Sequence, residues 1–306
     1  MNTQRYEVSR RRFALLAGGL AAAQIPILAA GKMSALEVVG QIKEKLGGEW
    51  PEGGLDGFKA GKPELPVTGI ATTAMATLDV LQKAAKAKLN LILTHEPTFY
   101  GRQDGPAPPP APGGRGRGPG GVLPNDPVYQ AKREFIEKEG LVVFRLRDHW
   151  VARPENYMAL GLAEALGWSK YAVPGDGVYD IPAASAEDVV SMVRKKLNLR
   201  GGLRAVGDRK ARVKRVMLQP GLMAVATMWK NYSQVDMLLS GEVREWECTH
   251  YAWDMFGIGE KRNLVTIGRV ASEDPGMAAC AKWLTSAIQG VPAKWIDAGD
   301  PYWRAV

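Results

Sequence analysis

The segment Leu89-Asn90-Leu91-Ile92-Leu93-Thr94-His95-Glu96-Pro97 decides how this chain of 306 residues is interpreted. Its three consecutive branched apolar residues at 91–93 indicate a strand that is buried on both faces, as in a parallel sheet. A histidine and a glutamate follow that strand directly. Open parallel sheets place their sites at the carboxyl ends of strands, so the segment predicts an α/β fold with a site at His95 and Glu96.

Strands and helices alternate on both sides of this segment, which is typical of an α/β fold. Further strands are expected at 67–71, 141–146, 213–219, 235–239, 263–267 and 293–296. Helices are expected at 33–46, about 72–85, 126–139, 157–166, 185–197, 223–232, 242–255 and 275–288. Thr72 or Thr73 is expected to cap the second helix, and Pro220-Gly221 to form a turn. We therefore expect a two-lobed α/β fold, with a mostly parallel mixed sheet flanked by helices and a smaller inserted α/β lobe.

The domain organisation follows from composition. We assign residues 31–168 and 236–306 to one α/β domain that carries the site, and residues 169–235 to the inserted lobe. Residues 101–121 read GRQDGPAPPPAPGGRGRGPGG, which cannot pack a core and predicts a flexible surface insertion. Its Arg-Gly pattern has no interleaved aromatic residue for base stacking, so we expect no nucleic-acid partner.

The first 30 residues have the features of a secretory signal. Ser9-Arg10-Arg11-Arg12-Phe13 precedes residues 14–30, which carry no charge and end in small residues. Ser-Arg-Arg-X-Phe resembles the twin-arginine export motif, which implies export of a folded protein, often with metal bound. We expect cleavage after Ala30, a periplasmic or secreted product, and no stable membrane association after cleavage. The alternative is an uncleaved anchor, which the interrupted apolar run disfavours.

Composition limits the function. The chain is 46% hydrophobic and 24% charged, so it can bury a core. Its formal charge is +8, and the first 30 residues carry four arginines and one glutamate, which leaves +5 for the remainder. This mild excess fits an anionic small molecule better than a nucleic-acid surface. Only Cys248 and Cys280 occur, too few for a cysteine-rich zinc site.

Charged and metal-competent side chains follow four of the expected strands. These side chains are His95-Glu96, Asp148-His149, Arg269 with Glu273, and Glu242 with Glu245. Imidazole and carboxylate ligands suit zinc, manganese or ferrous iron, so the pattern makes a metal site plausible. Each residue also has a structural interpretation. His95 could be a buried histidine bonded to backbone, Asp148 a cap or turn residue, and Glu273 a solvated residue before the helix at Pro275.

Four short motifs at these residues resemble the dinuclear-metal-centre hexameric family, also described as GTP-cyclohydrolase-I-type-two-like or NGG-one-interacting-factor-three-like. The first combines the strand at 67–71, Thr77-Leu78-Asp79, and Thr94-His95-Glu96-Pro97. The second is a strand that ends at Asp148, followed by Leu166-Gly167. The third is Ser240-Gly241-Glu242, and the fourth is Gly268-Arg269 followed by Glu273. Together they span most of residues 67–299, and the middle lobe matches least.

The resemblance implies a toroidal homo-oligomer, a hexamer, with a metal site that faces an inner cavity. It implies His95, Glu96, Asp148 and Glu273 as ligands of one or two divalent ions (zinc, manganese or iron). Two family histidines are replaced, by Glu96, which can still donate oxygen, and by Arg269, which cannot ligate. Arg269 is instead expected to pair with a carboxylate or, with Glu242, to bind substrate.

The mechanism implied is metal-assisted hydrolysis of a small-molecule substrate, in which a metal-bound water has its pKa lowered towards ~7. Glu96 or His149 would accept the proton, and His149 is also a substitute nitrogen ligand. Two other functions remain open at this point: a metal-binding protein without catalysis, and a metal-free assembly protein.

Overall fold

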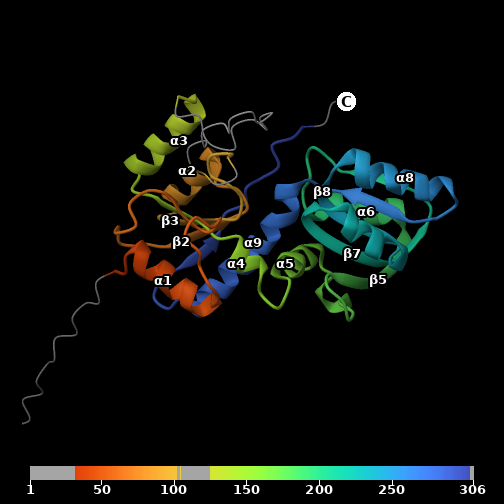
Figure 1. Cartoon of the computed structure of the whole chain (residues 1–306), viewed down its shortest axis with the longest axis horizontal. Helices are drawn as coiled ribbons and strands as arrows, with labels where there is room; N and C mark the ends of the chain where they lie inside the picture. The colour runs from red at the N-terminus through yellow and green to blue at the C-terminus, as the bar shows by residue number, and fades with distance from the viewer. Residues whose placement is uncertain (1–31, 102–103, 105–124, 304–306) are drawn as a thin grey trace, which may run out of the picture. The chain divides into compact units, whose positions relative to one another are not determined.

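The computed structural model describes residues 32–101, 104 and 125–303 (Figure 1). The expected signal peptide at 1–30 and nearly all of the expected insertion at 101–121 lie outside the described residues. Among the described residues, no helix combines the length and the apolar character that a membrane span requires.

The first of two sheets has five strands in the order β1-β4-β3-β2-β10. The strands are β1 (Gly57–Ala60), β4 (Val142–Arg145), β3 (Leu91–Thr94), β2 (Ile70–Thr73) and β10 (Ala293–Trp295). All neighbouring pairs are parallel except β1 with β4, which is antiparallel. The apolar run at 91–93 therefore lies in the central strand of a mostly parallel sheet.

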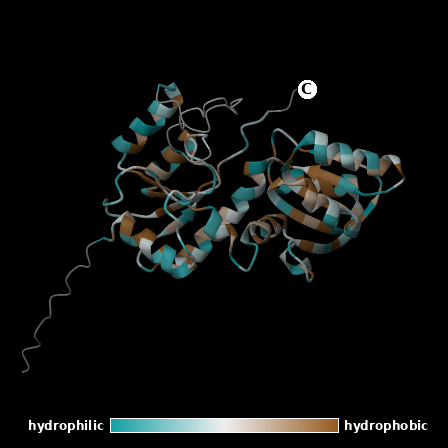
Figure 2. Cartoon of the chain, in the orientation of Figure 1, coloured by the Kyte–Doolittle hydropathy of each residue, from teal (hydrophilic) through white to brown (hydrophobic). Residues whose placement is uncertain are grey.

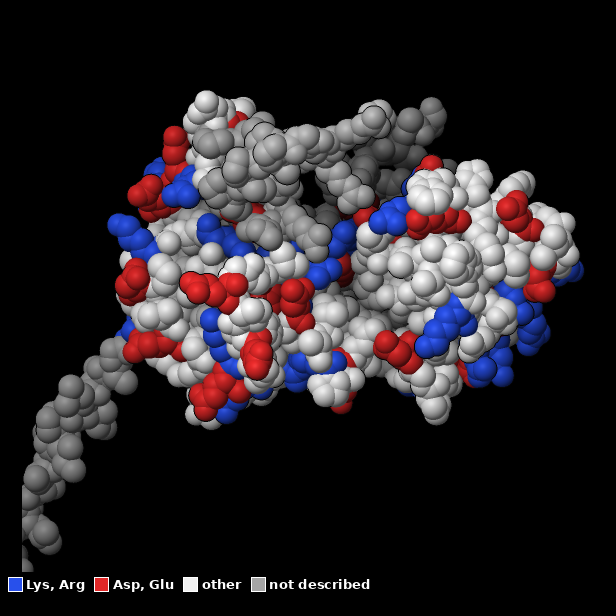
Figure 3. Space-filling model, viewed as in Figure 1, with Lys and Arg blue, Asp and Glu red and all other residues white. Residues whose placement is uncertain are grey.

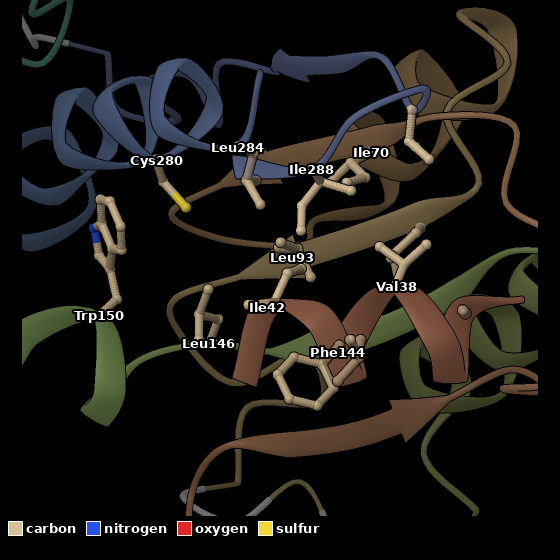
Figure 4. Close-up of a cluster of buried hydrophobic side chains, with 14 of the residues drawn as sticks. Val38, Ile42, Ile70, Leu93, Phe144, Leu146, Trp150, Cys280, Leu284 and Ile288 are labelled. Atoms are coloured by element: carbon tan, nitrogen blue, oxygen red, sulfur yellow. The ribbon is translucent and has the colours of Figure 1, made fainter. Parts of the chain in front are cut away.

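Helices cover both faces of this sheet. Side chains on successive strand residues point to opposite faces, so Leu93 contributes to one core and Ile92 to another. On the first face, α1 (Ala35–Leu46) and α9 (Arg269–Ala287) pack their apolar residues against the strands, as Figure 4 shows for Val38, Ile42 and Leu284. On the opposite face, α2 (Leu78–Lys86) and α3 (Pro127–Lys138) do the same.

The second sheet also has five strands, in the order β5-β7-β8-β9-β6. They are β5 (Val178–Ser185), β7 (Arg212–Met223), β8 (Met237–Val243), β9 (Asn263–Thr266) and β6 (Arg204–Gly207). The three central strands are parallel and the two edge strands are antiparallel to their neighbours. One face is covered by α5 (Tyr157–Leu166) and α6 (Ala186–Lys196), the other by α7 (Val225–Asn231) and α8 (His250–Gly257). The two mixed sheets, with apolar residues gathered along their strands (Figure 2), confirm the expected α/β class.

Helix α9 joins the two sheets. It contacts β2 and β10 of the first sheet, β7 and β8 of the second, and helix α5. A Cβ atom on Gly161 of α5 would lie 2.3 Å from the carbonyl oxygen of Pro275, so the two helix backbones touch. Asp274 of α9 accepts hydrogen bonds from the backbone N–H groups of Ala74 (2.7 Å) and Ala298 (3.0 Å). Burial raises the pKa of Asp274 from 3.8 to about 7; the two N–H bonds oppose this shift and Asp297 adds to it.

The start of α9 corrects the sequence analysis. The helix was expected to begin at Pro275, but it begins at Arg269, so Pro275 lies inside it. A proline this close to the N-terminus removes one helical hydrogen bond, to the carbonyl of Ala271. The preceding residues, among them Ser272 and Glu273, are buried, and this tertiary packing stabilises the early turns.

Three other local expectations were wrong. Thr72 and Thr73 lie in β2, and the residue that caps α2 is Thr77. Residues 220–221 form no turn; they continue β7 through an irregularity between Gln219 and Leu222. Residues 242–243 extend β8, followed by a π-helical turn at Glu245–Thr249 before α8 begins. The two cysteines are free, buried thiols.

Candidate metal centre

The chain after β3 places His95 and Glu96. The backbone N–H groups of His95 and Glu96 donate to the carbonyls of Thr73 (3.1 Å) and Ala74 (2.8 Å), respectively. The hydrogen bonds between the β2 and β3 segments therefore extend beyond the end of β3. The buried guanidinium of Arg145 donates to the carbonyl of His95 at 3.1 Å. His95 is thereby held at the carboxyl edge of the sheet, and its side chain is 2% exposed.

The first turns of α9 place Arg269 and Glu273. Gly268 precedes the helix with φ +96° and donates to the carbonyl of Gly241 at 2.8 Å, which ties the helix start to β8. The hydroxyl of Ser272 donates to the carbonyl of Arg269 (2.6 Å) and accepts from the N–H of Gly221 (2.9 Å). The helix start is thus bonded to both β7 and β8.

Two glycines make this close approach possible. A Cβ atom on Gly221, where φ is +77°, would lie 2.5 Å from Oε1 of Glu273. A Cβ atom on Gly241 would lie 2.3 Å from the Ser272 hydroxyl. A side chain at Gly221 would displace the Glu273 carboxylate, and one at Gly241 would also meet the Gly221 backbone, so these glycines leave room for Glu273 at this position. Pro220-Gly221 was expected to form a turn, and the approach of Gly221 to Glu273 was not predicted, although a Pro-Gly pair within an apolar strand pattern is a signal for a bulge.

The structure brings His95, Glu96 and Glu273 together, although they come from β3 and α9. One ligand-competent atom from each residue lies within 4.8 Å of the others. His95 Nε2 is 3.6 Å from Glu273 Oε1, and the Glu96 and Glu273 side chains are only 12% and 5% exposed. Among the described residues, the buried His95 Nδ1 and Glu273 Oε2 atoms have no hydrogen-bond partner. Buried polar atoms normally have partners, so this nitrogen and oxygen set fits a divalent cation.

A fixed positive charge also lies in this cluster. Arg269 Nη2 donates to Glu96 Oε1 at 2.9 Å, Nε lies 3.6 Å from Glu273 Oε1, and Nη1 lies 3.8 Å from Glu242 Oε1. Burial acts to lower the pKa of Arg269, but the Glu273, Glu96 and Glu242 carboxylates together raise it. The guanidinium is therefore a permanent cation among three carboxylates. From the sequence, Arg269 was expected to pair with a carboxylate.

The two remaining candidate residues lie outside the three-residue group. The Asp148 side chain is 48% exposed and pairs with Arg147 Nη1 at 2.9 Å, while Arg147 Nε lies 3.8 Å from Glu96 Oε1. Asp148 is thus linked to the cluster through Arg147. His149 has Nδ1 2.7 Å from Asp56 Oδ2 and Nε2 2.9 Å from the Glu49 carbonyl, so oxygen atoms face both ring nitrogens.

Asp56 is a further residue of the site region that the sequence did not predict. Its buried carboxylate accepts from the N–H groups of Arg147 (2.6 Å), Asp148 (3.0 Å) and His149 (2.9 Å), which caps the short helix α4 (Asp148–Val151). The His149 ring also stacks on Trp50, with centroids 3.4 Å apart. This arrangement holds the segment after β4 in place beside the site.

A cavity of about 890 Å³ opens on the cluster. Glu96, Glu242 and Arg269 line it, together with residues 201–204 and 298–303. In the view of Figure 3, acidic and basic side chains lie in small groups between larger areas of other residues. The arrangement can therefore bind a metal ion at its buried end and a polar or charged small molecule beside it.

Solved structures share this arrangement of two sheets. A comparison with protein-family models finds no match, and a comparison with curated proteins finds none either. The Staphylococcus aureus hypothetical protein SA1388 matches at TM-score 0.64 and 15% identity, over 89% of this chain and 99% of that chain. A Bacillus cereus protein related to NIF3 matches at TM-score 0.64 and 13% identity, over 88% and 98% of the two chains.

The chain has the NIF3 fold. The protein ybgI, of unknown function, matches as well, at TM-score 0.62 and 19% identity, over 88% of this chain and all of that one. At these identities the comparison establishes the NIF3 fold alone. It confirms the two-lobed α/β fold that the resemblance of the short motifs implied.

Proposed function

We propose that this protein binds one divalent ion (zinc, manganese or iron) through His95, Glu96 and Glu273 and hydrolyses a small-molecule substrate beside it. The observation that carries the proposal is the buried convergence of one imidazole and two carboxylates within 4.8 Å, with two of their polar atoms unpaired. A buried acidic pair beside a histidine is costly without a compensating cation. An ion between His95 Nε2 and Glu273 Oε1, which lie 3.6 Å apart, would add positive charge beside both carboxylates.

The charge of Arg269 favours one ion over two. A guanidinium stays protonated and cannot ligate a metal. It already neutralises part of the acidic cluster, with Nη2 2.9 Å from Glu96. A second divalent ion would stand close to this fixed cation without the histidine that the family motif has at position 269. Arg269 thus supplies the positive charge that a second ion would bring.

Each residue has a role in this proposal. The ion supplies Lewis-acid polarisation of a carbonyl, imine or phosphoryl group. Arg269 binds an anionic group of the substrate, because its guanidinium lines the cavity and is 27% exposed. Glu242 orients that guanidinium from β8. Glu96 faces the same cavity and accepts a proton from the attacking water. His149, the other base named from the sequence, has oxygen atoms against both ring nitrogens and has no role in this proposal.

Elemental analysis tests metal binding. We expect about one transition-metal ion per chain in the wild type, a loss of it in His95→Ala, and no loss in His250→Ala. His250 is a matched control because it is exposed on α8. A panel of phosphoester, ester and cyclic amide substrates then tests catalysis. Turnover that disappears in His95→Ala supports a hydrolase, whereas bound metal without turnover on any class supports a metal-binding protein.

A second candidate function is a metal-free assembly protein. The observation that favours it is the ion pair of Arg269 with Glu96, which compensates buried acid without any metal. A wild type that takes up no zinc, manganese or iron from a saturating solution would support this function and contradict the first.

We also propose export through the twin-arginine pathway, supported by the residues at 9–13 and the uncharged run that follows. Cell fractionation should recover the protein outside the cytoplasm. A variant with Arg10→Lys and Arg11→Lys should accumulate inside the cell, and an unchanged distribution would contradict export by this route.

Assembly into a homo-oligomer, a hexamer by resemblance, is a further part of the proposal. Large apolar side chains are exposed in and beside α8: Trp246 (74%) in the turn before it, Trp253 (57%) within it and Ile258 (77%) directly after it. Such groups are typical of surfaces that another subunit covers. Light scattering should give a mass that is a multiple of the chain mass, and a monomer at micromolar concentration would contradict assembly.

A further inference from the structure

Three aromatic side chains line the cavity above the candidate metal centre. Tyr100, Tyr302 and Trp303 are 62%, 68% and 80% exposed, and all three belong to the cavity that Glu96 and Arg269 also line. Large aromatic rings usually lie mostly buried in a folded chain. Three of them exposed around one polar floor indicate a surface that a ligand covers.

The position of Tyr100 is fixed by the fold. Its φ is +66°, a left-handed conformation that a bulky residue rarely adopts and that is concentrated at functional sites. The ammonium group of Lys132 lies 4.7 Å from the centre of its ring and donates a hydrogen bond to the Thr98 carbonyl. A buried lysine therefore supports the ring and the loop that begins at Glu96.

The segment that leads to Tyr302 and Trp303 is also held by the fold, through bonds of Asp300. Their segment follows β10 of the first sheet and contacts the loop before β6 of the second sheet. The Asp300 carboxylate accepts from the N–H groups of Gly201 (2.9 Å) and Tyr302 (3.0 Å), and the Asp300 carbonyl accepts from Arg200 (3.0 Å). A Cβ atom on Gly201 would lie 2.2 Å from that of Tyr302, so the backbones are in close contact. The segment thus carries its aromatic residues to the cavity as part of the folded chain.

We propose that this cavity binds a planar aromatic molecule that bears an anionic group. The aromatic part lies against Tyr100 and Trp303, because flat rings offer the largest contact to exposed aromatic side chains. The anionic group is bound by Arg269, which is the cation at the floor. This proposal rests on the proposed function, because the bound ion fixes where the reacting group of the molecule lies. Binding of the ring depends on Tyr100 and Trp303, which are not metal ligands in that function.

Calorimetric titration of the full-length, metal-supplemented protein tests this inference with two probes, 2-naphthyl phosphate and n-butyl phosphate. The probes share an anionic group and differ in the ring. We expect 2-naphthyl phosphate to bind at least about tenfold more tightly, because stacking on an aromatic side chain is typically worth roughly five- to 150-fold. Trp303→Ala and Tyr100→Ala should each remove most of this preference and leave n-butyl phosphate binding unchanged.

Controls separate the alternatives. Trp303→Phe should retain the preference, and Trp253→Ala, which removes an exposed tryptophan of α8, should not change it. Arg269→Gln should weaken both probes equally. Equal affinity of the two phosphates, or an unchanged preference in Trp303→Ala and Tyr100→Ala, would overturn the inference. Metal content is measured on each sample, so a metal-free wild type would contradict the proposed metal site while the ring preference is still read from the titrations.

Discussion

Replacement of Arg269 by methionine tests the charge balance of the cluster. The substitution keeps an unbranched side chain but removes the cation that lies 2.9 Å from Glu96 and 3.6 Å from Glu273. Removal of one partner from a fully buried ion pair typically costs about 3–5 kcal/mol. Because the Arg269 side chain is 27% exposed, solvent screens part of this effect, and we expect a loss of roughly 1–3 kcal/mol in the metal-free protein.

The same variant should respond more strongly to metal than the wild type. Without the guanidinium, a divalent ion no longer meets a like charge and compensates two otherwise unpaired carboxylates. An ion at 100 times its Kd stabilises the folded state by about 2.7 kcal/mol, which should offset most of the loss.

Thermal unfolding with and without zinc or manganese measures both effects, at roughly 2–4 °C per kcal/mol for a domain of this size. Arg209→Met is the control, since its side chain is 79% exposed and pairs only with Glu187 among the described residues. An Arg269→Met protein as stable as the wild type without metal, and unresponsive to metal, would refute the reasoning.

Three further outcomes are expected. Gly221→Ala should lose bound metal and about 1–3 kcal/mol of stability, because the new Cβ would lie 2.5 Å from Glu273 Oε1. Gly290→Ala is the control, since Gly290 has nearly the same φ (+78° against +77°) but no atom within 4 Å of the added Cβ. It should lose stability and keep its metal, as measured by elemental analysis. Leu93→Ala, at a fully buried position, should cost about 2–5 kcal/mol in urea unfolding, and a loss below about 1 kcal/mol would contradict the core assignment. Asp274 has a pKa near 7 in the folded chain against 3.8 ordinarily, so its contribution to stability is present below pH 4 and is lost as the pH rises towards 7. In Asp274→Asn, the free energy of unfolding should therefore decline less between pH 4 and pH 7 than in the wild type. Equal declines in the two proteins would contradict this contribution of Asp274.

Much of the fold could be predicted from local pattern. The apolar run at 91–93 indicated a strand buried on both faces, and Asp126-Pro127 fixed the start of α3 as expected. The α5 helix ends before Gly167, which adopts the left-handed conformation that favours glycine at a helix end. These features depend on neighbours in sequence, which is why one sequence sufficed.

The errors arose where tertiary contacts override local signals. Proline is common at the start of a helix, so α9 was expected to begin at Pro275. Burial of the residues before it stabilises additional helical turns, and α9 begins at Arg269. The sequence pattern also could not show that β7 and β8 approach α9 closely at Gly221 and Gly241. A glycine in the sequence does not reveal which distant segment lies against it. The grouping of His95 with Glu273 was expected from strand ends, whereas the role of Asp56 as a cap 92 residues from Asp148 carried no local signal.

Anomalous diffraction from crystals of the zinc- or manganese-loaded protein would test the metal centre most directly. The account predicts a single peak per chain, about 2.0–2.3 Å from atoms of His95, Glu96 and Glu273. No peak at these residues, or a peak ligated by Asp148 and not by Glu273, would contradict it.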